Sequence, residues 1–429
     1  MKQGRAARGW VALLCAAALA CLLSACTRHE SGPVVLRFWA MGREGEVVRE
    51  LLDDFERTHP DIRVEVQQLP WTSAQEKLLT AFAGDVTPDL CQLGNTWISQ
   101  FAALGSLAPL QSYVGRPGGV PADDYFQGIW ESNRIGASLY GVPWYVDTRL
   151  IYYRRDLLAQ AGFAAAPVDW AEWTRVLAAL KRRSPRDYGI LLPLNEFEPL
   201  LALALQQQTP LLRDGDRYGN FRSAEFRRTL QFYVDMFRNK WSPAVSNTQI
   251  SNVWDEFAKG YYSFYISGPW NIGEFKRRLP ADKQDIWMTA PLPGPTGPGA
   301  SSAGGSSLVV FERSRHKNEA WQVIDYLSQP SVQHRFYEMT GNLPPRRSAW
   351  NDRQLANDPY VAAFRNQLER AKSPPKVPEW ERIATEMRLV TEALVAGRMS
   401  VDQAVTELDA RADRILEKRR WMLRHGDRS

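Results

Sequence analysis

The feature that most constrains the fold is a regular alternation of strand-like and helix-like patterns near the start of the chain. Short apolar or alternating runs at 34–39, 62–66 and 89–93 are separated by segments with helical periodicity at 46–58 and 74–83. Such alternation is typical of a parallel sheet covered by helices. The sequence therefore predicts an α/β fold.

Strand and helix patterns return later in an order that predicts more than one lobe. The middle and the end of the chain are mostly helical by period, at 171–180, 199–206, 223–238, 383–396, 401–419 and from 318 onward. A strand-like run at 302–311 lies between these helical blocks. We expect the chain to cross between two lobes more than once, with a Pro-, Gly- and Ser-rich segment at 291–307 as one crossing.

The N-terminus has the pattern of an export signal. Lys2, Arg5 and Arg8 precede a charge-free run at 10–23, which is short for a membrane-spanning helix. The run ends in Leu23-Ser24-Ala25-Cys26, which resembles the lipobox of bacterial lipoproteins. We expect a signal peptide at 1–25, a lipidated tether at 26–33 with Cys26 acylated, and a bacterial membrane anchor facing the periplasm or cell exterior. An ordinary secretory signal is the alternative.

Cysteines and charge exclude several classes of protein. After cleavage only Cys26 and Cys91 remain of four cysteines, so with Cys26 acylated no internal disulfide forms. Cys91 lies in an apolar run and is expected to be a small buried side chain. The formal charge of +5 falls by three with the leader, and basic residues are interleaved with acids. Nucleic-acid binding is therefore not expected.

The chain lacks the common catalytic signatures. It has no Gly-x-Ser-x-Gly elbow, His-Glu-x-x-His motif, Walker loop or dinucleotide fingerprint. Five scattered histidines give no metal-binding pattern, so we expect no metal, no cofactor and no enzymatic activity. A pair of facing carboxylates, as in a glycosidase, stays open as an alternative.

Tryptophans stand beside polar residues where strands should end. Trp39, Trp97, Trp144 and Trp270 are each next to a polar loop or an amide, carboxylate or guanidinium side chain. An indole offers a flat apolar face for the C–H side of a sugar ring, while neighbouring polar groups pair with its hydroxyls. Each tryptophan alone is more simply explained by core packing, and the group as a whole favours carbohydrate binding.

Several blocks of the chain form an ordered set of motifs. The longest block, 140–158, has a Gly-x-Pro pattern at Gly141 and Pro143, a spacer, and two apolar residues before Tyr153. Shorter blocks lie at 88–97, 268–270, 304–306 and 341–346. Together these blocks resemble the family 1 extracellular solute-binding proteins, the sugar receptors of ABC importers. Arg154 stands where that family usually has Asn or Asp after the tyrosine.

The resemblance implies a two-lobed periplasmic-binding-protein-like type II fold with a hinge and an interlobe ligand cleft. It places 34–143 with 290–315 in the first lobe and 147–289 with 316–429 in the second, with crossings near 142–146, 290–293 and 312–318. The ligand-binding residues that the tryptophan pattern and the resemblance together predict are Trp39, Asn95, Thr96, Trp97, Trp144, Asp147, Arg149, Trp270, Gly305 and Arg346.

The resemblance also implies partners. The expected ligand is a disaccharide or oligosaccharide, and the expected partner is the transmembrane permease of an ABC importer, with the receptor itself a monomer. A phosphorylated polyol such as a glycerol phosphate ester is the alternative ligand, because it would suit Arg149 and Arg346. A lipid-anchored glycan hydrolase is the alternative from another functional class.

Overall fold

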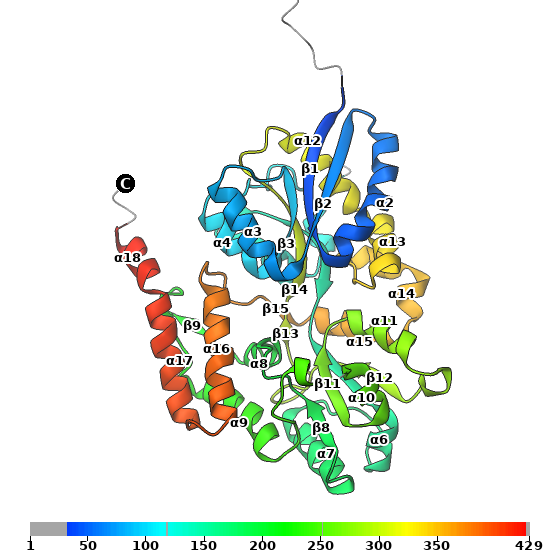
Figure 1. Ribbon diagram of the computed structural model, residues 1–429, viewed down its shortest axis with the longest axis vertical. Helices are drawn as coiled ribbons and strands as arrows, with labels where there is room; N and C mark the ends of the chain where they lie inside the picture. The colour runs from blue at the N-terminus through cyan, green and yellow to red at the C-terminus, as the bar shows by residue number, and fades with distance from the viewer. Residues whose placement is uncertain (1–31, 117–118, 251, 426–429) are drawn as a thin grey trace, which may run out of the picture.

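The protein folds into two α/β lobes, one above the other in Figure 1. The computed structural model describes residues 32–116, 119–250 and 252–425. The expected leader, Cys26 and most of the tether lie outside the described residues. The two-lobed α/β fold that the sequence predicted is confirmed.

The first lobe is built on a five-stranded mixed sheet. Its strands run in the order β2-β1-β3-β14-β6. The first three are parallel, as predicted, whereas β14 is antiparallel to both of its neighbours. Their bounds are β1 (Val34–Met41), β2 (Ile62–Leu69), β3 (Leu90–Gly94), β6 (Val142–Asp147) and β14 (Gly304–Val310). Helices cover both faces, and all five residues of β3 are therefore buried.

The helices of the first lobe follow the predicted periodicity closely. In α2 (Gly42–Thr58) the buried apolar side chains recur every three or four residues and form one face against the sheet. The sheet is also flanked by α3 (Trp71–Ala83), α4 (Ile98–Ala103), α12 (Lys317–Leu327) and α13 (Pro330–Thr340). Cys91 is fully buried, as the sequence predicted.

The second lobe has a four-stranded sheet in the order β12-β7-β11-β8. Its strands are β7 (Leu150–Arg154), β8 (Tyr188–Leu191), β11 (Tyr262–Ser267) and β12 (Trp287–Ala290). The surrounding helices are α6 (Arg155–Gln160), α7 (Trp170–Arg183), α8 (Glu198–Ala204), α9 (Ala224–Arg238), α10 (Val253–Lys259), α11 (Trp270–Arg278), α14 (Arg353–Asn357) and α15 (Pro359–Leu368).

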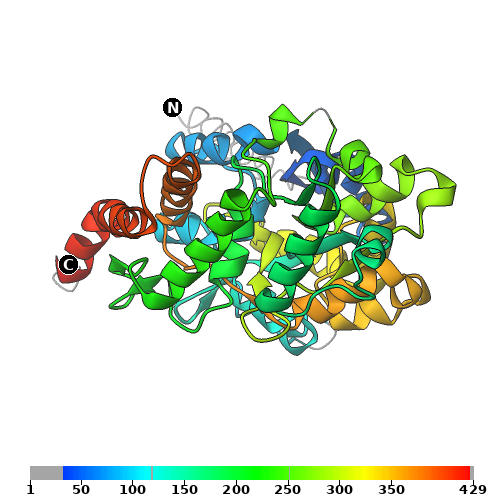
Figure 2. The ribbon, with the colours of Figure 1, turned by 90° about the horizontal axis from the view of Figure 1, so that it is seen from below.

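The C-terminal helices extend the second lobe to one side, at the left of Figure 1 and again in Figure 2. α16 (Trp380–Val395) and α17 (Val401–Ile415) pack together and on α9. The segment predicted as one helix at 401–419 is in fact two, because α17 ends at Ile415 and α18 (Glu417–His425) follows.

Short two-stranded ladders join other parts of the chain. The two-residue strands β13 (Ser301–Ser302) and β15 (Ala371–Lys372) pair in parallel between the lobes. In the second lobe, β9 (Leu212–Arg213) pairs with β10 (Tyr218–Gly219), and in the first β4 (Arg134–Ile135) pairs with β5 (Ser138–Leu139). A short helix, α5 (Gln127–Glu131), packs beside β15 and β6.

The predicted boundary between the lobes at residue 316 is wrong, because it assigns α12 and α13 to the second lobe. Trp321, Ile324 and Phe336, on α12 and α13, belong to the same buried cluster as Leu36 and Phe38 of β1. The chain therefore stays in the first lobe until about residue 340 and crosses afterwards, near Leu343, which pairs with Val146. The amphipathic pattern predicted these helices correctly, but it could not indicate which sheet their apolar faces cover.

Trp144, predicted as a binding residue, is a core residue instead. Its side chain is 1% exposed, and its ring stacks on Phe336 with 4.5 Å between centroids. Strand alternation explains the error, because Trp144 points to the face of β6 that α13 covers, and its neighbour Tyr145 is the one that reaches the cleft.

Replacing Trp144 with Ala should therefore destabilise the fold. We expect a loss of about 3–5 kcal/mol in the free energy of unfolding, because a large buried side chain leaves a cavity. Urea unfolding measures this loss. The matched control is Trp421→Ala on α18, where the indole is 57% exposed and the change should stay within about 0.5 kcal/mol. Equal losses for the two variants would contradict the core assignment.

Candidate functional site

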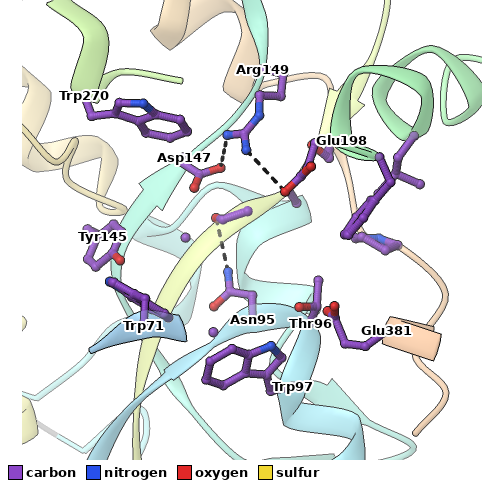
Figure 3. A pocket seen from close by; sticks show the side chains of 18 of the residues that line it. Trp71, Asn95, Thr96, Trp97, Tyr145, Asp147, Arg149, Glu198, Trp270 and Glu381 are labelled. Atoms are coloured by element: carbon purple, nitrogen blue, oxygen red, sulfur yellow. Dashed lines mark hydrogen bonds and ion pairs between the residues drawn. The ribbon is translucent and has the colours of Figure 1, made fainter. Parts of the chain in front are cut away.

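A cleft of about 550 Å³ lies between the lobes. Figure 3 shows its side chains converging from both sides, with Trp71 and Trp97 at the lower edge and Trp270 and Arg149 at the upper edge. Its lining residues are Glu44, Trp71, Gly94, Asn95, Thr96, Trp97, Tyr145, Asp147, Arg149, Phe197, Glu198, Leu201, Trp270, Ser302, Ala303, Gly304, Gly305, Asn342, Pro374 and Glu381.

The first lobe contributes residues just beyond the carboxyl end of β3. There the chain turns into η1 (Asn95–Trp97), at the edge where α/β sheets bind ligands. The Asn95 side chain is held by two hydrogen bonds. Its Nδ2 donates to the Gly304 carbonyl at 3.2 Å, and its Oδ1 accepts from Ser307 at 2.8 Å. Asn95 therefore braces the turn, while Thr96 and Trp97 face the cleft.

Two tryptophans of the first lobe pack edge to face. The Trp97 and Trp71 rings lie 5.7 Å apart at 66°. Trp71 begins α3 directly after Pro70, which ends the strand β2 and turns the chain towards the cleft. An edge-to-face pair leaves apolar ring surface available to a ligand and holds both rings in defined positions.

The opposite side of the cleft is organised around Arg149, between β6 and β7. Its guanidinium lies 3.3 Å from the Asp147 carboxylate, 3.8 Å from that of Glu198, and stacks 4.6 Å from the Trp270 ring centroid. Figure 3 shows both ionic contacts as dashed lines. Burial raises the pKa of Asp147, and the Arg149 charge opposes that rise. Arg149 is thus fixed in place and largely neutralised by protein carboxylates.

Two further carboxylates line the cleft, and neither forms an ion pair with a described residue. Glu44, in the first turn of α2, accepts a hydrogen bond from Asn342 at 2.6 Å, and Glu381 lies in the first turn of α16 beside Thr96. Burial raises the pKa of both Glu44 and Glu381. Of the described residues that line the cleft, four are acidic and only Arg149 is basic.

The arrangement suits a neutral polyhydroxylated ligand. Flat indole faces come from both lobes, and hydrogen-bond acceptors outnumber charged donors around them. Within the described part of the chain, no group of three or more His, Cys, Asp or Glu side chains could hold a metal ion.

Seven predicted site residues come together in the cleft, and three do not. Asn95, Thr96, Trp97, Asp147, Arg149, Trp270 and Gly305 line it, whereas Trp39, Trp144 and Arg346 lie elsewhere. Trp39 is buried in the core because β1 continues to Met41, so the tryptophan is inside the strand and not at its end. Arg346 pairs with Asp124 at 2.7 Å and donates to the Ser328 carbonyl at 3.0 Å. Arg346 therefore connects two segments of the chain outside the cleft.

Sequence reasoning missed several lining residues. Glu44 and Trp71 follow strands directly, so the position of a residue after a strand was a usable signal for them. Tyr145 was not predicted because it lies next to Trp144 in an apolar strand. Asn342 lies in the block 341–346 but was not chosen from it. Phe197, Glu198 and Glu381 lie in segments far along the chain, and no local pattern marks them.

The sequence matches a known family of bacterial proteins. The sequence model of the family described as bacterial extracellular solute-binding protein matches residues 41–334, about two thirds of the chain. The chain belongs to the bacterial extracellular solute-binding protein family. Members of this family are binding proteins and not enzymes.

Individual relatives of this solute-binding protein agree with the family assignment. The structure of the sugar-binding protein MalE from Xanthomonas citri is 58% identical, covers 91% of this chain and 99% of that chain, and has a TM-score of 0.89. An uncharacterized lipoprotein of Streptomyces antibioticus is 29% identical, over 87% of this chain and 86% of its own length. The diacetylchitobiose-binding protein DasA of Streptomyces coelicolor is 23% identical, over 83% of each.

The described residues of this solute-binding protein contain no membrane-spanning helix. None of the helices within 32–116, 119–250 and 252–425 combines the length and hydrophobicity that a span needs.

Replacing Glu44 with Gln should change how stability depends on pH. Burial raises the pKa of the folded carboxyl above its ordinary value of 4.5, so the folded state holds its proton to higher pH than the unfolded state does. The wild type therefore loses stability as pH rises from that ordinary value through the folded pKa, whereas glutamine cannot titrate. We expect the free energy of unfolding of Glu44→Gln, measured relative to that of the wild type, to rise over this interval and then stay constant.

Urea unfolding between pH 4 and pH 8 measures the effect. Glu65→Gln, which removes an exposed carboxylate on β2, is measured in parallel as the matched control. If the free energy of unfolding of Glu44→Gln falls relative to that of the wild type as pH rises, burial is not the main influence on the pKa of Glu44.

Proposed function

We propose that this protein is the solute-binding receptor of an ABC importer and captures a disaccharide or oligosaccharide between its lobes. The observation that carries the proposal is the facing set of indoles, Trp71 and Trp97 from one lobe and Trp270 from the other, with carboxylates around them. Sugar rings need an apolar surface for their C–H face and acceptors for their hydroxyls, and this cleft supplies both. The 58% identity to the sugar-binding protein MalE of Xanthomonas citri supports the same ligand class.

Binding would favour a closed arrangement of the lobes. A ligand that contacts Trp97 on one side and Trp270 on the other gains more interactions when the lobes approach. The ligand thus shifts the equilibrium towards closure by its differential affinity. The closed, loaded form is then the one recognised by the permease, which transports the sugar.

The charge of the cleft argues against a phosphate ester as the ligand. A phosphate group needs unpaired cationic donors. Arg149 is already shared by Asp147 and Glu198, and Arg346 is bound to Asp124 outside the cleft. Glu44 and Glu381 would repel a phosphate further. A neutral sugar is therefore the better match.

The proposal includes export and lipid anchoring through Cys26. The Leu23-Ser24-Ala25-Cys26 sequence supports it, as does the likeness to a lipoprotein of Streptomyces antibioticus. An acylated Cys26 would tether a monomeric receptor beside the membrane that holds its permease. Firm attachment needs more than one acyl chain, which lipoprotein processing supplies.

Sugar binding is tested first by adding a panel of disaccharides and oligosaccharides to the wild-type protein. We expect the ligand to change tryptophan fluorescence and to raise the melting temperature, because stacked indoles lose solvent and the bound state is stabilised. Trp97→Ala and Trp270→Ala should each weaken binding about tenfold or more, or about 1.4 kcal/mol. Isothermal titration calorimetry measures the affinities.

The control for these variants is Trp421→Ala, an exposed indole on α18 outside the cleft, which should bind like the wild type. Glycerol 3-phosphate belongs in the same panel. A panel in which no sugar binds, or in which glycerol 3-phosphate alone binds, would refute the carbohydrate assignment.

Lipid anchoring is tested by Cys26→Ser in a bacterial host. The wild type should partition into the detergent phase and incorporate labelled palmitate, whereas the variant should do neither, because serine has no thiol to acylate. Cys91→Ala, which alters a buried cysteine, is the control and should still partition with detergent. Labelling of the Cys26→Ser variant would show that the lipid is attached elsewhere.

A further inference from the structure

The C-terminal helix α18 exposes large apolar side chains at the edge of the second lobe. It projects from the end of α17, at the left of Figures 1 and 2, and lies outside the ligand cleft. None of the nine described residues of this helix is buried. Trp421 is 57% exposed, Met422 53% and Leu423 45%. Three consecutive large apolar side chains thus face solvent.

One side of α18 is held against the turn between β9 and β10. The Arg419 Nε donates to the Asp216 carbonyl at 3.1 Å, and the Arg420 guanidinium donates to the Arg217 carbonyl at 3.0 Å. The Arg420 guanidinium also lies 4.7 Å from the centroid of the Tyr218 ring. These contacts fix which side of the helix turns towards the lobe.

The opposite face of α18 is left to solvent. Its residues are three or four positions apart and are therefore neighbours on the helix surface: Lys418, Trp421, Met422 and His425. The Trp421 ring stacks on the His425 ring with 4.8 Å between centroids. An indole held in a defined position, with a thioether beside it and Lys418 at one end, thus points away from the protein.

The charge of α18 differs from that of the chain as a whole. Basic and acidic residues are interleaved along the sequence, whereas this helix carries four Lys or Arg residues and only one acidic residue, Glu417. Arg424 donates to the Arg420 carbonyl at 3.2 Å. Because backbone carbonyls are neutral, such contacts leave the positive charge of the guanidinium groups uncancelled. The exposed apolar side chains of α18 are therefore surrounded by cations.

This combination matches the surface of an anionic bilayer. Tryptophan is favoured at the membrane–water interface, where its ring lies at the level of the headgroups. Lysine and arginine extend their apolar stems along such a surface and place their charges at anionic headgroups. A second copy of the chain is the poorer partner, because two copies of this face would bring their cations together.

We propose that α18 is a membrane-contacting element that binds the headgroup region of a bilayer containing anionic phospholipid. With nine residues the helix lies on the bilayer, since spanning it takes about 20. Its contact is a second, reversible attachment beside the lipid proposed at Cys26. A tethered protein holds α18 at high local concentration near the membrane, so a weak contact suffices. The inference is independent of which ligand the cleft binds.

The test measures binding of the mature protein to lipid vesicles. The Cys26→Ser form, which has no thiol to acylate, is sedimented with vesicles of phosphatidylcholine alone and with vesicles of equal parts phosphatidylcholine and phosphatidylglycerol. We expect affinity to be about tenfold or more higher for the anionic vesicles, because each basic residue near such a surface contributes about 1 kcal/mol. Added sodium chloride should weaken this binding by screening the charges.

Variants of α18 locate the contact. Trp421→Ala, and separately Lys418→Gln combined with Arg424→Gln, should each lower the affinity for anionic vesicles severalfold. Leu389→Ala on α16 and Lys283→Gln in η4 (Ala281–Lys283) remove an exposed apolar and an exposed basic side chain elsewhere. These two matched controls should bind vesicles like the parent protein.

Thermal unfolding checks that each variant folds. Should Trp421→Ala fail to fold, Met422→Ala is the second apolar variant and should likewise weaken vesicle binding. Isothermal titration of any sugar that the parent protein binds should give the same affinity for all α18 variants, because α18 does not line the cleft.

Three results would overturn the proposal. The first is no sedimentation with either kind of vesicle, and the second is equal affinity for neutral and anionic vesicles. The third is unchanged vesicle binding by the α18 variants. If light scattering instead shows a dimer that Trp421→Ala abolishes, and no vesicle binding occurs, the exposed face belongs to a second copy of the chain and the proposal is wrong.

Discussion

The geometry of the cleft depends on the close approach of β14 to the end of β6. At Gly304 a Cβ atom would clash with the Asp147 carboxylate, and at Gly305, where φ is +110°, it would clash with the Tyr145 carbonyl. Only glycine fits both positions. A bulge in the pairing follows at Ser306 and Ser307. Tyr145, Asp147 and the Gly305 backbone are thereby brought together in the cleft.

The polar interior of the cleft follows from this arrangement. Asp147 ends β6 and Arg149 lies between β6 and β7, so a partly buried ion pair lies at the crossing between the lobes. Desolvating such a pair costs free energy unless further partners compensate. Glu198 and Trp270, both from the second lobe, provide them. The same contacts hold the Trp270 ring at the edge of the cleft.

The sequence predicted most elements of the fold but only seven of the twenty residues that line the cleft. The helix face of α2 and the strands β1 to β3 follow from apolar periodicity, which local packing enforces. Asn95, Thr96 and Trp97 were predictable because they directly follow a buried strand. Trp39 was not placed correctly, since its strand runs two residues further than the pattern indicated. Arg346 was misassigned because nothing local reveals its partner Asp124.

The sequence by itself determined the α/β class, the glycine pair at 304–305 and the positions of Trp97 and Trp270 after strands, because these depend on local backbone geometry and on periodicity. Only the tertiary structure decided which sheet α12 and α13 cover. It also decided that Glu198, Asn342 and Glu381 line the same cleft as Asn95. These residues are separated by up to several hundred positions in the chain. Their meeting depends on how two sheets and their helices pack, which no local pattern encodes.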